Sequence, residues 1–436
     1  MGTDADTPLE ELLVGMGDLE WWAHGSEQRA GAFRRLRDEA PVVFGEEPEI
    51  EGFGQGPGFW SLTRYEDVMH VSRHPELFCS GQGTNIFDMP TEIAEFFGSM
   101  INMDAPRHTR LRMIVNRAFT PRMVNRIDAD VRRKARAIVA RVAGRGTIDV
   151  VTDLAAPLPL EIICEMMGIP PDRWHRVFEL TNIILGDDTS TPDIGVLIGA
   201  AMEMAQMAAE VGEDRLANPR DDLVSAMMHA EVEGERLAPM EMASFFILLA
   251  AAGNETTRNA ITHGVRLLTD HPDQRAVWTA DVEGVTPTAV EEIVRWATPV
   301  IHFRRTATED TEVGGVPIAA GQKVVMWYES ANRDERAFGD PFRFDVTRSP
   351  NEHVGFGAGG PHFCLGANLA RREIRVMFEE VFRWIPDLHA TGTPTYLRSA
   401  FIHGITSLPA EFTPAEVPLA ALAELETDTD TEPTGD

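Results

Sequence analysis

The longest regular segment of the sequence is a helical pattern over residues 239–269, closed by Asp270, His271 and Pro272. Its residues have helical spacing, and the proline that follows cannot continue a helix. Roughly 30 residues at ~1.5 Å each would form a helix of ~45 Å, long enough to cross a whole domain. The chain has 436 residues, more than the ~250–300 at which a single core usually stops growing. It therefore either divides into domains or wraps one core around something large.

The other regular segments are mostly helical. Periodicity and start signals predict helices over residues 31–39, 107–118, 124–142, 158–167, 193–216 and 364–384. Strand patterns cover residues 58–61, 312–318 and 322–328, and residues 332–360 have the Arg, Asp, Pro and Gly content of irregular structure. The pattern predicts a mainly α fold with a smaller β region. We expect an N-terminal extension over residues 1–20, one domain over 21–411 and an acidic disordered tail over 412–436.

Charge and cysteine content exclude several classes of protein. The net charge is -30, and an acidic surface repels phosphate backbones, so we expect no nucleic-acid partner. No stretch approaches the ~18 uninterrupted apolar residues of a membrane span, and the acidic N-terminus lacks a signal-peptide pattern. We therefore expect a cytoplasmic protein, and we expect it to be a monomer. Cys79, Cys164 and Cys364 lack the short paired spacing of a disulfide framework or a structural zinc site.

The most informative segment is the glycine-rich stretch from Gly355 to Gly366, which reads GFGAGGPHFCLG. Glycine has no Cβ, so such a loop lets the backbone approach something flat and bulky. Cys364 is expected to open the helix over residues 364–384, where the helix dipole would favour its thiolate. The backbone N–H groups near Leu365 and Gly366 could then bond to the sulfur. For an isolated cysteine, the alternative is a buried structural thiol at a loop–helix junction.

This segment resembles the cysteine-ligand loop of the cytochrome P-450 family, although one extra residue separates Phe356 from Cys364. The resemblance implies the triangular, mainly α fold of that family, with haem b between the long central helix and the helix after the cysteine. It also implies that Cys364 is the axial thiolate ligand of the iron, that Phe356 packs beside it, and that His362 helps to hold a haem propionate. A thiolate ligand pushes electron density toward iron and favours O–O cleavage.

Residues 251–257 of the long helix read AAGNETT, and Ala252 and Thr256 share one helix face. An acid inside an apolar helix needs a reason, because an unpaired buried carboxylate costs several kcal/mol or shifts its pKa. The alternative is that Glu255 emerges into solvent. The segment resembles the family's oxygen-activation helix. On that match Glu255 is the acid and Thr256 the alcohol of a proton-delivery pair, and Gly253 makes room for O2.

Glu292 and Arg295 lie one helical turn apart. The default interpretation is an exposed ion pair worth well under ~1 kcal/mol. They also resemble the family's buried Glu–Arg pair, whose third member is usually an arginine of the irregular region. Arg343 and Arg348 are both candidates for that position.

Two more landmarks of the family concern the haem propionates. His108 and Arg112 lie one turn apart on a helix face, and Arg305 heads a strand. The resemblance implies that these three bind the propionates through charge-assisted hydrogen bonds. Arg304 is the competing choice for the third position.

Three segments, residues 102–106, 252–259 and 401–405, resemble the actinobacterial terminal hydroxylases of methyl-branched lipids and sterol side chains. The resemblance implies terminal hydroxylation of an apolar lipid, with O2 as oxidant and with ferredoxin and ferredoxin reductase as electron donors. Phe- and Met-rich segments suit a flexible apolar guest, although they equally fit an ordinary core. The residues expected to line the substrate pocket are Phe87, Met100, Ile101, Leu248, Ala252 and Val300.

Three alternative functions stay open at this point. The chain could hydroxylate a polyketide, a macrolide or another secondary metabolite. It could be a peroxygenase, although those relatives lack an acid–alcohol pair such as Glu255 and Thr256. It could also be a haem-binding sensor without catalytic activity.

Overall fold

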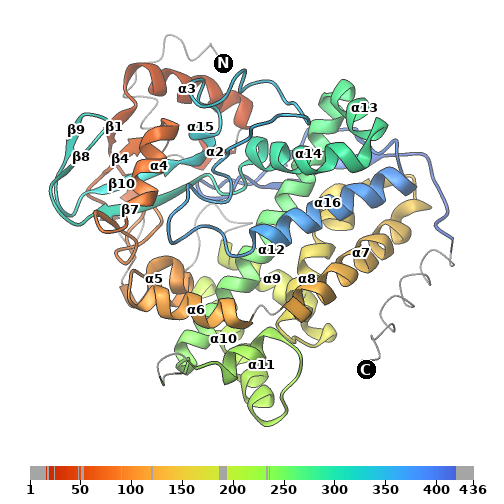
Figure 1. Ribbon diagram of the computed structural model, residues 1–436, viewed down its shortest axis with the longest axis horizontal. Coiled ribbons are helices and arrows are strands. Elements are labelled where there is room, and N and C mark those ends of the chain that lie inside the picture. The colour runs from red at the N-terminus through yellow and green to blue at the C-terminus, as the bar shows by residue number, and fades with distance from the viewer. Residues whose placement is uncertain are drawn as a thin grey trace, which may run out of the picture.

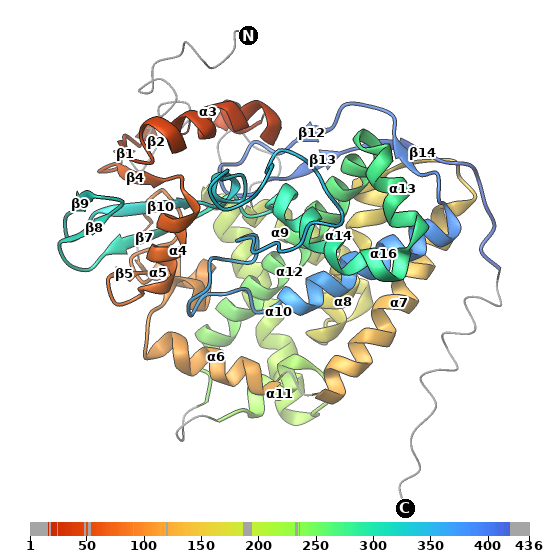
Figure 2. The same cartoon turned by 45° about the horizontal axis from the view of Figure 1, so that its top comes forward.

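The computed structural model describes residues 16–418 except for gaps at 17–18, 24, 48, 51–53, 90, 119–120, 186–193, 232–233 and 235. This part of the chain is mainly helical, with a smaller β region, which confirms the predicted fold class (Figure 1). The longer helices gather on one side of the molecule. A five-stranded sheet with its attached hairpin occupies the other side, and both views agree on this arrangement (Figures 1 and 2).

Helix α12 (Pro239–Asp270) runs through the middle of the helical side. Its bounds match the predicted long helix to within one residue, because Pro239 occupies its first turn and the carboxylate of Glu241 accepts the N–H of Ala238 at 3.0 Å. The helices that pack against α12 are α5 (Thr91–Gly98), α8 (Pro157–Met166), α9 (Trp174–Leu185), α10 (Ile194–Ala217), α13 (Pro272–Ala280), α14 (Val282–Ala297) and α16 (Ala367–Trp384). One large core therefore surrounds this helix.

The remaining helices pack against this core or on the side of the sheet. They are α2 (Leu19–Trp22), α3 (Ser26–Glu39), α4 (Tyr65–Arg73), α6 (Arg107–Ala118), α7 (Pro121–Ala143), α11 (Leu223–His229) and α15 (Tyr328–Ala331). Short 3₁₀ turns cover Ser99–Asn102 and Pro171–Arg173, and a π-helical turn covers Val150–Ala155. The sequence analysis did not predict α4, α5, α9, α11, α13 or α14.

The five-stranded sheet has the order β1 (Val42–Gly45), β4 (Phe59–Leu62), β10 (Lys323–Trp327), β7 (His302–Ala307) and β5 (Phe78–Cys79). Only β4 and β10 are parallel. The predicted strand over 312–318 is wrong as a single strand. It is a hairpin of β8 (Thr311–Val313) and β9 (Val316–Ile318), because Gly314 and Gly315 adopt positive φ and turn the chain.

Short strand pairs lie elsewhere in the described part of the chain. A three-stranded sheet joins β11 (His389–Ala390), β14 (Pro409–Glu411) and β6 (Thr147–Asp149). Strand β12 (Thr395–Tyr396) pairs with β13 (Ile405–Ser407), and β2 (Glu49–Ile50) pairs with β3 (Gly54–Gln55).

Both ends of the predicted domain extend beyond the expected boundaries. Met16 is 1% exposed, and its carbonyl accepts a hydrogen bond from the indole of Trp22 at 2.8 Å. Phe412 is buried, and the N–H of Ala415 donates to Ala143 at 2.8 Å. Residues 412–415 are therefore packed rather than part of the tail, whereas 1–15 and 419–436 lie outside the described residues. No described helix is both long and apolar enough to cross a membrane.

Two buried carboxyl groups on α16 give the first prediction. Glu373 is 2% exposed, and its Oε2 has no hydrogen-bond partner. Glu380 is equally buried, but it accepts hydrogen bonds from Arg136 at 2.9 Å and Trp384 at 3.0 Å. We expect Glu373→Met to stabilise the protein by ~1–3 kcal/mol at neutral pH, and Glu380→Met to cost ~3–5 kcal/mol, because it strands a buried arginine.

The effect of Glu373→Met depends on pH. Burial raises the pKa of Glu373 well above its ordinary value. The folded state then holds a proton that the unfolded state releases, so the wild type loses stability as the pH rises above ~4.3. Unfolding midpoints measured at pH 5 and pH 8 should show a larger gain for Glu373→Met at pH 8. An equal gain at both values would contradict this explanation.

Candidate functional site

The loop around Cys364 closes on itself in spite of its extra residue. The carbonyl of Phe356 accepts the N–H of Cys364 at 2.9 Å. The loop passes along α4, where the hydroxyl of Ser72 donates to the carbonyl of Gly359 at 2.9 Å. Gly360 has φ +77°, and a Cβ there would meet the backbone oxygen of Ser72 at 2.2 Å, so only glycine fits. The extra residue therefore does not separate Phe356 from Cys364.

Cys364 lies before the helix rather than at its start. Helix α16 begins at Ala367, so the prediction that Cys364 opens the helix is wrong by three residues. The residue retains solvent-accessible surface, yet burial raises the pKa of its thiol, while the backbone at Gly366 and the charges of Arg112 and Arg371 lower it. Burial outweighs the helix terminus, so the protein alone favours a neutral thiol. Metal coordination is what deprotonates such a group.

Four basic side chains, which we call the basic cluster, lie beside this loop. They are His108 and Arg112 of α6, Arg305 of β7 and His362 of the loop. The imidazole rings of His108 and His362 are 4.2 Å apart between centroids. Arg112 donates from Nη2 to the carbonyl of Phe363 at 2.6 Å. The structure therefore brings together all four residues that the sequence assigned to propionate binding.

Among the described residues, no carboxylate forms an ion pair with a member of the basic cluster, although the charge of Asp104 acts on His108 and Arg305. Arg305 is 4% exposed, and it donates to the carbonyl of Arg304 at 2.7 Å. The Nε2 atom of His108 is buried without a hydrogen-bond partner. Burial, followed by the charges of Arg305, His108 and Arg112, lowers the pKa of His362 to about 2, so its imidazole is neutral at physiological pH. Such a cluster suits an acidic ligand.

Arg304 is engaged elsewhere. Adjacent residues of a strand point to opposite faces, and Arg304 forms an ion pair with Asp88 at 2.6 Å. It also donates to the carbonyls of Gln82 at 2.9 Å and Asn85 at 3.3 Å. Of the two candidates, Arg305 is therefore the one that lies in the basic cluster.

The acid of α12 is buried, so the solvent-exposed alternative is wrong. Glu255 is 2% exposed and forms an ion pair with Arg258. Its Oε1 also accepts a hydrogen bond from Asn259 Nδ2 at 2.8 Å. The hydroxyl of Thr256 instead donates to the carbonyl of Ala252 at 2.8 Å. Ala252 is exposed and Thr256 half-buried, so this face of α12 differs from its buried surroundings.

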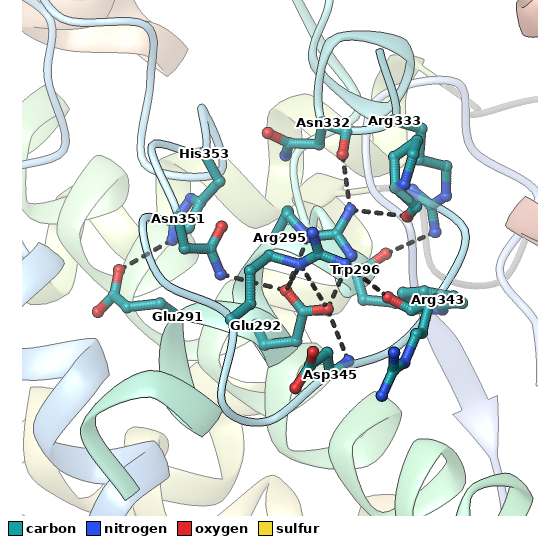
Figure 3. A network of polar contacts seen from close by, with 12 residues as sticks. Glu291, Glu292, Arg295, Trp296, Asn332, Arg333, Arg343, Asp345, Asn351 and His353 are labelled. Carbon is teal, nitrogen blue, oxygen red and sulfur yellow. Dashed lines mark hydrogen bonds and ion pairs between the residues drawn. The ribbon is translucent and has the colours of Figure 1, made fainter. Parts of the chain in front are cut away.

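Glu292 and Arg295 form a fully buried pair on α14 (Figure 3). Both side chains are 0% exposed, and Arg295 Nε lies 2.7 Å from Glu292 Oε2, which excludes the exposed-pair interpretation. The third member is Arg348, whose Nε lies 3.0 Å from the same oxygen. Arg343 contributes its carbonyl to Arg348 at 2.8 Å. Arg295 also donates to the carbonyls of Asn332 at 2.8 Å and Pro341 at 2.9 Å, which ties α14 to the segment leading to Cys364.

Comparison with known proteins identifies the family of this chain. The Cytochrome P450 family profile matches residues 172–384. A methyl-branched lipid omega-hydroxylase of Mycobacterium tuberculosis is 52% identical over 411 residues, which are 92% of this chain and 96% of that protein. The chain belongs to the cytochrome P450 family. It is a P450 monooxygenase, and the family implies a haem-iron cofactor.

Two further relatives support the P450 assignment. A steroid C26-monooxygenase of Rhodococcus jostii is 44% identical, covering 87% of this chain and 81% of that protein. A solved structure of a Mycobacterium marinum cytochrome P450 in complex with pseudoionone is 45% identical. It superposes with a TM-score of 0.85 over 90% of this chain and 97% of that one.

The residues present fit a haem group. Haem carries two propionate carboxylates. The basic cluster offers Arg112 and Arg305, which donate to backbone carbonyls, together with the His108 Nε2 atom that has no hydrogen-bond partner. The glycine-rich loop presents Cys364 next to that cluster, because Arg112 bonds to the carbonyl of the preceding residue. Ligand and counter-charges therefore lie where one flat acidic cofactor could contact both.

The predicted substrate-pocket residues have mixed environments. Ala252 is exposed, Met100 is 5% exposed, and the half-buried ones are Phe87, Ile101, Leu248 and Val300. Met204 and Met207 belong to the core, which favours the ordinary-core interpretation for these two. Met202 is 64% exposed.

The sequence analysis missed three residues around the cysteine loop, namely Glu291, His353 and Arg371. Glu291 binds both of the others, with Oε2 2.9 Å from His353 Nε2 and Oε1 2.6 Å from Arg371 Nε. The signal was available, since Glu291 precedes Glu292 directly and two consecutive acids in an apolar helix each need a partner.

Proposed function

We propose that this P450 carries haem b and hydroxylates the terminal carbon of a methyl-branched lipid, an isoprenoid or a sterol side chain. The observation that carries the substrate class is the 52% identity, over 92% of the chain, to a protein named for methyl-branched lipid omega-hydroxylation. The 44% identity to a steroid C26-monooxygenase points to the same kind of carbon. A ferredoxin with its reductase as electron donors, a monomeric state and a cytoplasmic location stay predictions from the sequence.

The chain's own residues would hold the cofactor in three ways. Cys364 would supply the sulfur ligand of the iron, with Phe356 beside it. Arg112, Arg305 and His108 would neutralise the propionates. His362 would donate a hydrogen bond to a propionate. When bound, the haem iron supplies O2 activation and the transfer of one oxygen atom to a C–H bond.

Glu255 and Thr256 would move protons within the site. The carboxylate of Glu255 is held by Arg258 and Asn259, which supply the partners that a buried carboxylate needs. The hydroxyl of Thr256 lies on the Ala252 face of α12 and can exchange its proton at Oγ1. Glu255 would have to turn away from Arg258 to pass a proton to that hydroxyl.

We expect Thr256→Ala to bind haem and lipid normally. It should form less hydroxylated product for each molecule of reduced nicotinamide that it consumes. General acid–base steps contribute ~10²–10⁴-fold to a rate. Without the Thr256 hydroxyl, we expect the electrons from the nicotinamide to reduce O2 to hydrogen peroxide instead of supporting hydroxylation. Thr257→Ala is the matched control, because Thr257 is the next residue on the same helix and is buried on another face. Wild-type coupling in Thr256→Ala would remove this role from Thr256.

The substrate proposal is tested by locating the inserted oxygen. Terminal C–H bonds are harder to attack than their neighbours, so the pocket must hold the methyl group closest to the oxidant. Burial of a long apolar chain at ~25 cal/mol per Å² supplies affinity with few polar contacts. We expect the protein, with ferredoxin, its reductase and phytanic acid, farnesol or cholest-4-en-3-one, to yield terminal alcohols detected by mass spectrometry.

Two outcomes would overturn the proposal in different ways. Oxygen found mainly at ring or mid-chain carbons, or no turnover of any of the three lipids, would remove the substrate class. Absence of lipid-stimulated nicotinamide consumption with any of them, in protein that binds haem, would favour the sensor alternative.

A further inference from the structure

Phe356 connects α16 and α14 to the cysteine. Its carbonyl accepts the N–H of Cys364 at 2.9 Å. Its ring lies under the guanidinium of Arg371, whose Cζ is 4.3 Å from the ring centroid. The ring of His353 contacts it from another side, at 5.7 Å between centroids and an interplanar angle of 45°. A shift of this one side chain would therefore move the backbone that presents the sulfur.

Glu291 of α14 binds both partners of Phe356, and Figure 3 shows its contact with His353. Arg371 binds the carboxylate of Glu291 through a bidentate contact, with Nε 2.6 Å from Oε1 and Nη2 3.0 Å from Oε2. His353 Nδ1 accepts the N–H of Gly355 at 3.1 Å, so its proton resides on Nε2 and is donated to Glu291 at 2.9 Å. The carboxylate of Glu291 therefore fixes both contacts.

The charges of Glu291 and Arg371 act on the sulfur of Cys364. Burial alone would raise the pKa of Glu291, but the hydrogen bonds from His353 and Arg371 lower it to about 2, so the carboxylate is ionised at neutral pH. Arg371 lies over the ring of Phe356, whose carbonyl binds the N–H of Cys364, so its cation favours negative charge at the sulfur and the carboxylate of Glu291 bound to it offsets part of that effect. Net charge around a ligating sulfur sets the reduction potential of its metal.

We propose that Glu291 is a positioning residue for the Cys364 ligand. Through Arg371 and His353 it holds Phe356 against the cysteine and balances the positive charge behind the sulfur. The inference rests on the proposed haem ligation by Cys364 and goes beyond it, because it assigns a function to an acid outside the Glu292–Arg295 pair.

The test is the reduction potential of the haem-loaded protein in two variants of opposite charge. Arg371→Gln removes a cation near the sulfur, so the potential should fall. Glu291→Gln keeps the shape and frees the charge of Arg371, so the potential should rise. Loosening of the loop alone would shift both variants in the same direction. Arg375→Gln is the control, because Arg375 lies one turn further along α16 and pairs with Glu379 at 2.6 Å.

Each outcome decides one question. A wild-type protein without a thiolate-type spectrum in its reduced, CO-bound form would overturn the proposed function. With that spectrum present, shifts of the same sign, or shifts no larger than that of Arg375→Gln, would overturn this inference alone. If Glu291→Gln does not accumulate in folded form, the Arg371→Gln potential decides, and a value at or above that of the wild type counts against the proposal.

Discussion

Replacing Cys364 by alanine will abolish thiolate ligation. The glycine-rich loop presents this sulfur beside the basic cluster through the Phe356–Cys364 and Arg112–Phe363 hydrogen bonds. Neither other cysteine can take its place. Cys164 is fully buried in α8, where burial raises the pKa of its thiol far above the ordinary value. We expect the reduced, CO-bound form of Cys364→Ala to lose the thiolate-type Soret band completely.

The controls for this variant separate loss of the ligand from loss of the fold. Cys79 lies in β5, and burial, followed by the charge of Asp104, raises the pKa of its thiol. Cys79→Ser and Cys164→Ala should both keep the wild-type band. A thiolate-type band in Cys364→Ala would refute the central assignment. Loss of the band in Cys79→Ser with retention in Cys364→Ala would place the ligand on the sheet instead.

Helices with a clear apolar stripe could be predicted from the sequence. Helix α6 has the predicted bounds, and α12 differs by one residue. Helix α14 was missed because nearly all of its second half is buried, so no stripe of polar residues alternates with its apolar ones, and because Pro287 lies inside it. Helix α4 was missed because its nine residues give too few turns for a periodic signal.

In the candidate site, too, some contacts could be predicted from local spacing and others could not. Local spacing was enough to bring Glu292 near Arg295, since residues three apart on a helix are neighbours. The choice between Arg304 and Arg305 depended on which face of β7 meets the cysteine loop, and no local pattern carries that information. Arg343 and Arg348 lie in irregular chain, where side-chain direction has no period. The Arg258 partner of Glu255 could have been found, because it too lies three residues away.

Removing either partner of the Glu292–Arg295 pair should have the other large effect. Glu292 accepts hydrogen bonds from Arg295 at 2.7 and 2.8 Å, from the Asp345 N–H at 3.0 Å and from Asn351 at 3.1 Å. Glu292→Ala leaves a buried guanidinium without its counter-charge, and Arg295→Ala leaves the carboxylate. Either change should cost ~3–5 kcal/mol, a large fraction of the ~5–15 kcal/mol by which domains are stable.

The loss should appear as missing haem, because the network joins α14 to the chain that presents the cysteine. The carbonyl of Asn332 accepts from Arg295 at 2.8 Å, and its side-chain oxygen accepts from the N–H of Val354 at 2.8 Å, two residues before Phe356. We expect both variants to be haem-poor or insoluble when expressed, measured as the ratio of Soret to protein absorbance. Arg343→Ala is the control, because Arg343 is exposed and lies beside the network without binding Glu292. Full haem content in either variant would contradict this prediction, because it would mean that the cysteine loop keeps its shape without the Glu292–Arg295 pair.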